Sequence, residues 1–76
     1  MQIPVNVVGN ILNSGKVAHR VRVADDADDT GGFLIYEWWD DSEGPNERRC
    51  FDSWVENRDD LRQFFAESGW LIDWPA

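Results

Sequence analysis

Carboxylates are the most numerous side chains of this sequence that could support binding or chemistry. Asp and Glu number 15 against seven Lys and Arg, which gives the 76-residue chain a formal net charge of −8. Like charges at this density repel one another, so they indicate either solvated loops or a surface for a cationic partner. Eleven of the 15 fall into three groups: Asp25, Asp26, Asp28 and Asp29; Asp40, Asp41 and Glu43; and Asp52, Glu56, Asp59 and Asp60.

The functional interpretation of the first two groups is a surface that imitates the charge of a nucleic acid. It would occupy a basic surface of a partner, such as a nuclease or a nucleic-acid-binding complex, with fast, salt-sensitive association. Trp38, Trp39 and Trp54 are candidate apolar anchors beside these charges, because buried aromatic residues dominate tight interfaces. Direct binding to nucleic acid or to an anionic membrane is disfavoured, because both require Lys and Arg. In bulk composition the chain resembles phage-encoded inhibitors and toxin-immunity proteins, with which it shares no motif.

A second pattern resembles the calcium-binding loop of an EF-hand. Positions 1, 3, 5 and 12 of that loop would be Asp26, Asp28, Thr30 and Glu37. Gly31 falls at the turn position, but the flanking helices are missing, because residues 17–23 alternate like a strand. We therefore predict no metal site and keep these four residues as the alternative.

Other catalytic chemistry has little support in the sequence. His19 and Cys50 are the single histidine and the single cysteine, so neither a zinc site nor an intramolecular disulfide can be assembled from them. Glu37 lies in an apolar run, where we expect it either to pair with Arg20 or Arg22 or to lie at the rim of the sheet. We predict a non-enzymatic protein without a cofactor. Since no signal-like N-terminus and no apolar run of membrane-spanning length occur, we also expect a cytoplasmic protein.

The elements that position these residues follow from periodicity and turn signals. The run Phe33–Trp39 predicts a central strand with both faces largely covered, because neither of its faces is polar. A helix is predicted between an Asn57 N-cap and Gly69, since Leu61, Phe64 and Phe65 share one face. Further strands are predicted over Ile3–Leu12, Val17–Val23, Glu47–Val55 and Trp70–Trp74.

The predicted order is β-β-β-β-α-β in a single domain, residues 1–76. The fold class is α+β: a small antiparallel sheet of four to five strands with one helix packed on a face. One such helix cannot cover both faces, so some aromatic residues of the second face would stay open. The alternative function is therefore binding of a neutral peptide or ligand, or of a second copy as a homodimer, through that face. Its members would come from Leu34, Tyr36, Trp38, Trp54, Trp70 and Trp74.

Overall fold

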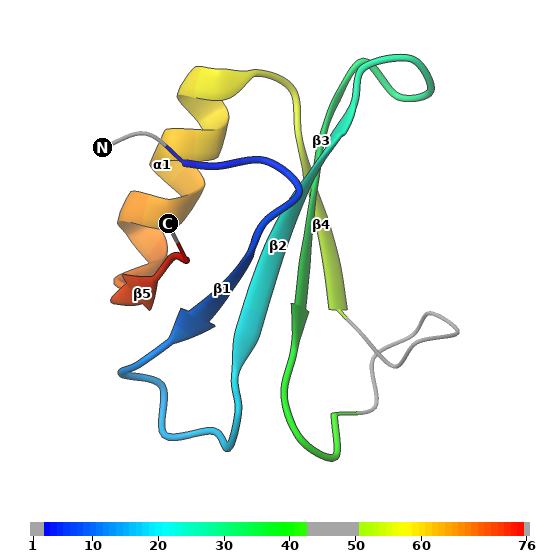
Figure 1. Cartoon of the computed structure of the whole chain (residues 1–76). Helices are drawn as coiled ribbons and strands as arrows, with labels where there is room; N and C mark the ends of the chain where they lie inside the picture. The colour runs from blue at the N-terminus through cyan, green and yellow to red at the C-terminus, as the bar shows by residue number, and fades with distance from the viewer. Residues whose placement is uncertain (1–2, 43–50, 76) are drawn as a thin grey trace.

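A computed structural model describes residues 3–42 and 51–75 of the chain. It has a five-stranded antiparallel sheet with one helix packed on it, in the order β-β-β-β-α-β (Figure 1). The predicted α+β arrangement is confirmed. The elements are β1 (Val8–Ile11), β2 (Arg20–Asp26), β3 (Gly32–Trp38), β4 (Phe51–Val55), α1 (Arg58–Ser68) and β5 (Ile72–Asp73). Residues 47–50 of the predicted fourth strand lie outside the described residues.

The strands are ordered β4-β3-β2-β1-β5. β3 lies between β4 and β2, which confirms the prediction that it is a central strand and not an edge strand. The middle position of the sheet belongs to β2, because β1 lies beside β2 and the C-terminal β5 pairs with β1. Periodicity within β3 cannot reveal this order.

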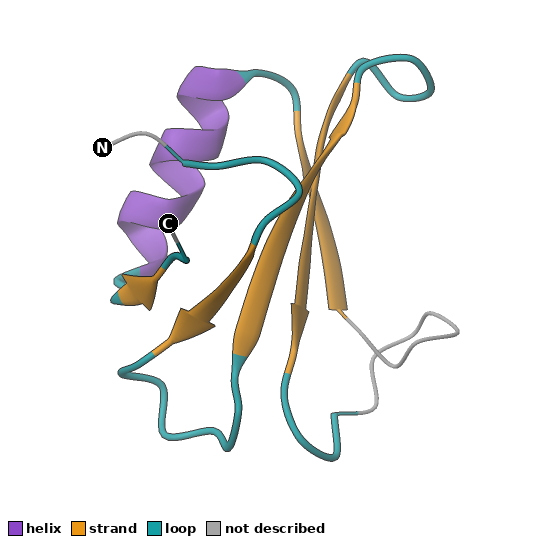
Figure 2. Ribbon diagram, in the orientation of Figure 1, coloured by secondary structure: helices purple, strands orange, loops and turns teal. Residues whose placement is uncertain are grey.

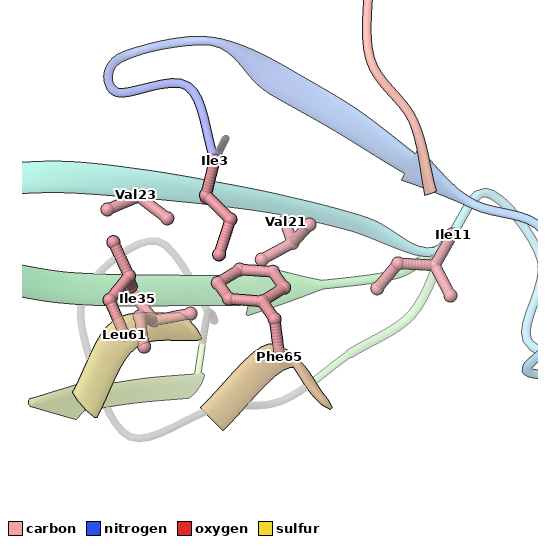
Figure 3. Close-up of a cluster of buried hydrophobic side chains, with 7 residues drawn as sticks. All are labelled: Ile3, Ile11, Val21, Val23, Ile35, Leu61 and Phe65. Carbon is pink, nitrogen blue, oxygen red and sulfur yellow. The ribbon is translucent and has the colours of Figure 1, made fainter. Parts of the chain in front are cut away.

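The core lies between α1 and one face of the sheet (Figure 3). Val21 and Val23 project from β2 and Ile35 from β3, and Leu61 and Phe65 from the helix meet them. Ile3 and Ile11 complete the buried cluster. Burial of apolar area at about 25 cal/mol per Å² makes this layer the main favourable contribution to folding.

The helix begins and ends where its capping residues predict. The Asn57 side chain accepts a hydrogen bond of 2.8 Å from the Asp60 amide, and Gly69 ends the helix at φ 70°. Both positions satisfy backbone groups that the helix leaves unpaired at its ends. The sequence therefore predicted this element correctly at both ends.

Strand boundaries differ more from the prediction. Asn6, at φ 62°, and Ala18, at φ 53°, interrupt the extended backbone, so β1 starts at Val8 and β2 at Arg20. Ile3 remains buried although it precedes the first strand. At its other end β2 continues through the acidic segment, because Asp25 and Asp26 pair with β3.

The last predicted strand, Trp70–Trp74, is reduced to the two residues of β5. Trp70 and Trp74 contact the Phe65 ring on the helix side of the sheet, with centroids 5.9 and 6.2 Å from it. Trp70 and Trp74 are therefore not part of an open aromatic face, which was the alternative binding surface.

The opposite face of the sheet carries no helix (Figure 2). Instead, arginines of β2 lie over the aromatic residues of β3. The Arg22 guanidinium lies 5.4 Å from the Tyr36 ring centroid, and that of Arg20 lies 5.8 Å from the Trp38 ring. These rings are half-buried as a result, at the distances of cation–π contacts. Within residues 3–42 and 51–75, no helix has the length and apolar character needed to cross a membrane.

Candidate functional site

The two acidic groups on either side of β3 lie at opposite ends of the sheet. Asp26 is paired with Gly32 at one end of the β2–β3 ladder, and Arg20 with Trp38 at the other. Seven paired residues at about 3.3 Å each separate these ends by roughly 20 Å. Asp40 and Asp41 follow the second end, while Glu43 lies outside the described residues. The predicted acidic residues therefore do not form one continuous surface.

Three residues of the third acidic group, Glu56, Asp59 and Asp60, lie at the same end of the molecule as the first group, whereas Asp52 pairs with Tyr36 farther along the sheet. The β2–β3 hairpin loop and the connection from β4 to α1 lie at the same end, at the top of Figure 1. Trp54 links them, because its Nε1–H donates a hydrogen bond of 2.8 Å to the Thr30 hydroxyl of the hairpin. We call this region the acidic end and define it as Asp25, Asp26, Asp28, Asp29, Glu56, Asp59 and Asp60.

The hairpin loop satisfies its own backbone and leaves its carboxylates outside. The Asp26 carbonyl accepts hydrogen bonds from the amides of Asp29, Thr30 and Gly31 at 3.2, 2.9 and 3.1 Å. The Asp25 carboxylate accepts one from the Ala27 amide at 3.0 Å. Asp28 and Asp29 are exposed. The loop thus holds a fixed shape with carboxylates on its outer side.

Few cations neutralise the acidic end. Among the described residues the ion pairs are His19–Glu37, Arg20–Asp40 and Arg62–Asp59, and none of them includes an aspartate of the hairpin. Arg58, which directly precedes Asp59, lies over the Phe33 ring at 5.3 Å from its centroid. Unpaired carboxylates in close proximity produce a negative potential that attracts cationic partners.

Trp54 is the exposed aromatic residue beside these carboxylates. It is 48% exposed and packs against the backbone of Gly32, where a Cβ would lie 2.7 Å from its Nε1. The sequence predicted Trp54 as one of three candidate anchors, and the structure places it next to the hairpin. An exposed indole beside charges is the type of residue that dominates the energy of protein interfaces.

The other two candidate tryptophans lie at the far end of the sheet in intramolecular contacts. Trp38 lies under Arg20, which also forms an ion pair of 3.4 Å with Asp40. Trp39 stacks on Phe51 with centroids 5.2 Å apart, and the Lys16 ammonium lies 4.9 Å from its ring. The structure therefore divides the predicted partner-binding residues into an unneutralised end and an internally paired end.

The four residues of the alternative calcium loop are not brought together. Asp26 ends β2, and Glu37 lies five residues beyond Gly32 on β3, roughly 17 Å along the strand. The Thr30 hydroxyl accepts the Trp54 indole N–H. In the part of the chain that is described, no three His, Cys, Asp or Glu side chains gather as metal ligands.

Glu37 pairs with His19, and the prediction of a pair with Arg20 or Arg22 was wrong. Those arginines project to the opposite face, because side chains alternate along a strand. His19 lies on the same face as Glu37, and its Nε2 is 2.7 Å from the Glu37 Oε2. Sequence parity could have indicated this pair, since residue 21 lies opposite Glu37 and residue 19 shares its face.

Ser14 extends this pair into a hydroxyl–imidazole–carboxylate chain. Its Oγ lies 2.7 Å from the His19 Nδ1 and accepts a hydrogen bond of 3.2 Å from the Lys16 amide. The imidazole is only 2% exposed and is covered edge-on by Trp39 and Trp70. These groups are those of a nucleophilic triad. The Ser14 hydroxyl already accepts a hydrogen bond within the turn, and the His19 ring is enclosed by tryptophans. We therefore interpret the hydrogen-bonded series Ser14–His19–Glu37 as a structural link between the β1–β2 turn and β3.

No family model, no curated protein and no solved structure matches this chain.

Proposed function

We propose that this protein binds and blocks a basic surface of a partner protein through its acidic end. The observation that carries the proposal is the hairpin of Asp25, Asp26, Asp28 and Asp29, which no ion pair of the described residues neutralises, linked by a hydrogen bond to exposed Trp54. Carboxylates around an aromatic residue combine long-range attraction with an apolar contact. A partner surface that handles nucleic acid offers the matching positive charge.

The proposed role needs no catalysis and no cofactor, because blocking a surface requires only shape and charge. The protein would act in the cytoplasm, where a chain with one cysteine needs no disulfide. A negative end would also accelerate encounter with a positive partner, and salt would weaken it. Strong dependence of the association rate on ionic strength is therefore the signature expected of the complex.

The proposal is tested by comparing two variants that each lose four negative charges, one at the hairpin and one elsewhere in the molecule. One variant changes Asp25, Asp26, Asp28 and Asp29 to Asn, which retains a carbonyl acceptor for the hydrogen bond to Ala27. The matched control removes four charges elsewhere: Asp40, Asp41, Asp52 and Asp73 to Asn. After a partner is identified by capture from lysate at low salt, its affinity for each variant is measured at about 50 and 500 mM salt.

The hairpin variant should lose at least about tenfold in affinity at low salt, with a shallower salt dependence, while the control loses far less. Circular dichroism of both variants should match the unmodified protein, because all these side chains are exposed or at turns. Equal losses in the two variants would show that net charge matters and the hairpin does not. Unchanged affinity in the hairpin variant would contradict the proposal.

A second candidate is binding of a neutral ligand, or of a second copy, through the open face of the sheet. The observation that favours it is the exposure of Trp54, at 48%, on the terminal strand β4, where it lies opposite Leu34 of β3. This mode would depend little on salt. Sedimentation at two protein concentrations detects self-association, and Trp54→Ala should then weaken the dimer while the four-Asn hairpin variant should not.

A further inference from the structure

A groove lies between the end of β4 and helix α1, beside the acidic end. Its volume is about 320 Å³, close to the lower limit of roughly 300–1,000 Å³ for small-ligand sites. Trp54, Val55 and Phe64 supply apolar lining. The polar lining is Glu56, Asp60, Gln63 and Glu67. The groove is thus apolar in part, surrounded by acidic residues, and of a size for one side chain and not for a large ligand.

The helix positions explain how these groups come together. Asp60, Phe64 and Glu67 are spaced four and three residues apart, so they share one face of α1. The Gln63 amide donates a hydrogen bond of 3.1 Å to the Glu67 carboxylate, which restrains that side chain. The core face of the helix, with Leu61 and Phe65, is adjacent and buried. The groove face is therefore a second face of the same helix, and its Phe64 ring packs at the edge of the core against Phe65 and Trp70.

The carboxylates that line the groove favour a cation as its ligand. Among the described residues, no ion pair includes Glu56, Asp60 or Glu67. Nor do these carboxylates converge as metal ligands, since the described part of the chain holds no such group. Carboxylates spread around a groove suit a cation that is larger than a metal ion and that donates hydrogen bonds in several directions.

The guanidinium group has these properties. It is planar, presents five N–H donors, and stacks on aromatic rings such as that of Phe64. Its aliphatic stem can lie along Val55, because long cationic side chains bury their methylene groups against apolar surface. A lysine ammonium is a compact, strongly hydrated charge and matches an aromatic, multi-carboxylate groove less well.

From these observations we infer that the groove between β4 and α1 receives an arginine side chain of the partner. The inference rests on the proposed function, since a basic partner must dock at the acidic end, and it adds the residue type that is bound. The bound arginine would be one specific contact next to the long-range electrostatic attraction of the hairpin carboxylates.

The test is an NMR titration of the full-length protein with acetyl-Gly-Arg-Gly-amide. Matched peptides carry citrulline, which has nearly the shape of arginine without its charge, or lysine. The reporters are the Gln63 side-chain amide and the Phe64 ring for the groove, and the Asp28 and Asp29 amides for the hairpin. A triple variant, Glu56→Gln, Asp60→Asn and Glu67→Gln, removes the groove carboxylates. A control variant, Asp41→Asn, Asp52→Asn and Asp73→Asn, removes the same charge elsewhere.

The arginine peptide should shift the groove reporters in a saturable way at millimolar concentration, and the lysine peptide should bind several-fold more weakly. Citrulline should give no saturable shift. The triple variant should bind the arginine peptide with roughly tenfold lower affinity, and the control variant with an affinity lowered less than about twofold.

Equal effects of the triple and control variants, or equal binding of arginine and citrulline, would overturn the inference. Shifts confined to the hairpin reporters would also overturn it while leaving the proposed function standing. Conversely, arginine binding in the groove together with full partner affinity in the four-Asn hairpin variant would support the groove and refute the hairpin as the docking surface.

Discussion

The contact between His19 and Glu37 gives the sharpest test of the fold. Replacing Glu37 by Ala removes the acceptor 2.7 Å from the His19 Nε2 and leaves a nearly buried imidazole without that partner. Hydrogen bonds to charged groups contribute about 1.5–3 kcal/mol. Because the Glu37 side chain is 26% exposed, water can partly replace it, so we expect a loss of about 2 kcal/mol in the free energy of unfolding.

That loss corresponds to a decrease in Tm of about 8–16 °C for a domain of this size. Urea unfolding followed by tryptophan fluorescence measures the loss in the free energy of unfolding, since Trp39 and Trp70 surround the imidazole. Glu37→Gln retains an acceptor oxygen and should lose about 1 kcal/mol or less. Arg22→Ala, on the opposite face, should not reproduce the effect. A Glu37→Ala protein within about 0.5 kcal/mol of the original would refute the pairing.

Two further substitutions test local geometry. Gly32→Ala places a Cβ 2.2 Å from the Val55 carbonyl oxygen, so β4 must shift and stability should fall by at least about 2 kcal/mol, read from the urea midpoint. An unchanged midpoint would show that β4 does not pack there. Asn57→Ala removes the helix cap and should cost about 1 kcal/mol, with faster hydrogen exchange of the Asp60 amide as its specific readout. Exchange at the original rate would contradict the cap.

Local signals predicted the elements well, and the helix best of all. Asn57 and Gly69 specify its ends through backbone chemistry that acts within a few residues. β1 and β2 start later than predicted because Asn6 and Ala18 adopt positive φ, which is unusual for alanine and common for asparagine mainly in turns. The order of the strands depends on contacts between distant segments, such as Ile11 with Ile72, and periodicity does not encode these.

The candidate site was predictable in its composition but not in its grouping. The hairpin carboxylates and Trp54 were identified from residue type alone. That Glu56 and Asp60 join the hairpin end, while Asp40 pairs with Arg20, depends on how the hairpin and the β4–α1 connection meet in three dimensions. The predicted partners of Glu37 were the arginines of the neighbouring hairpin, but in the register of β2 and β3 these lie on the opposite face, and His19 shares the face of Glu37.

The hydrogen bond from the Trp54 indole to Thr30 has a consequence for the affinity of the proposed complex with a basic partner. A large exposed ring normally samples several rotamers, and freezing such a side chain on complex formation costs about 0.5–1.5 kcal/mol. Here the fold has already selected one orientation before any partner arrives. Under the proposed function, preorganisation of this kind lets a small contact area give a higher affinity than its size suggests, and Thr30→Val, which removes the acceptor of the Trp54 indole, should lower the affinity for the partner.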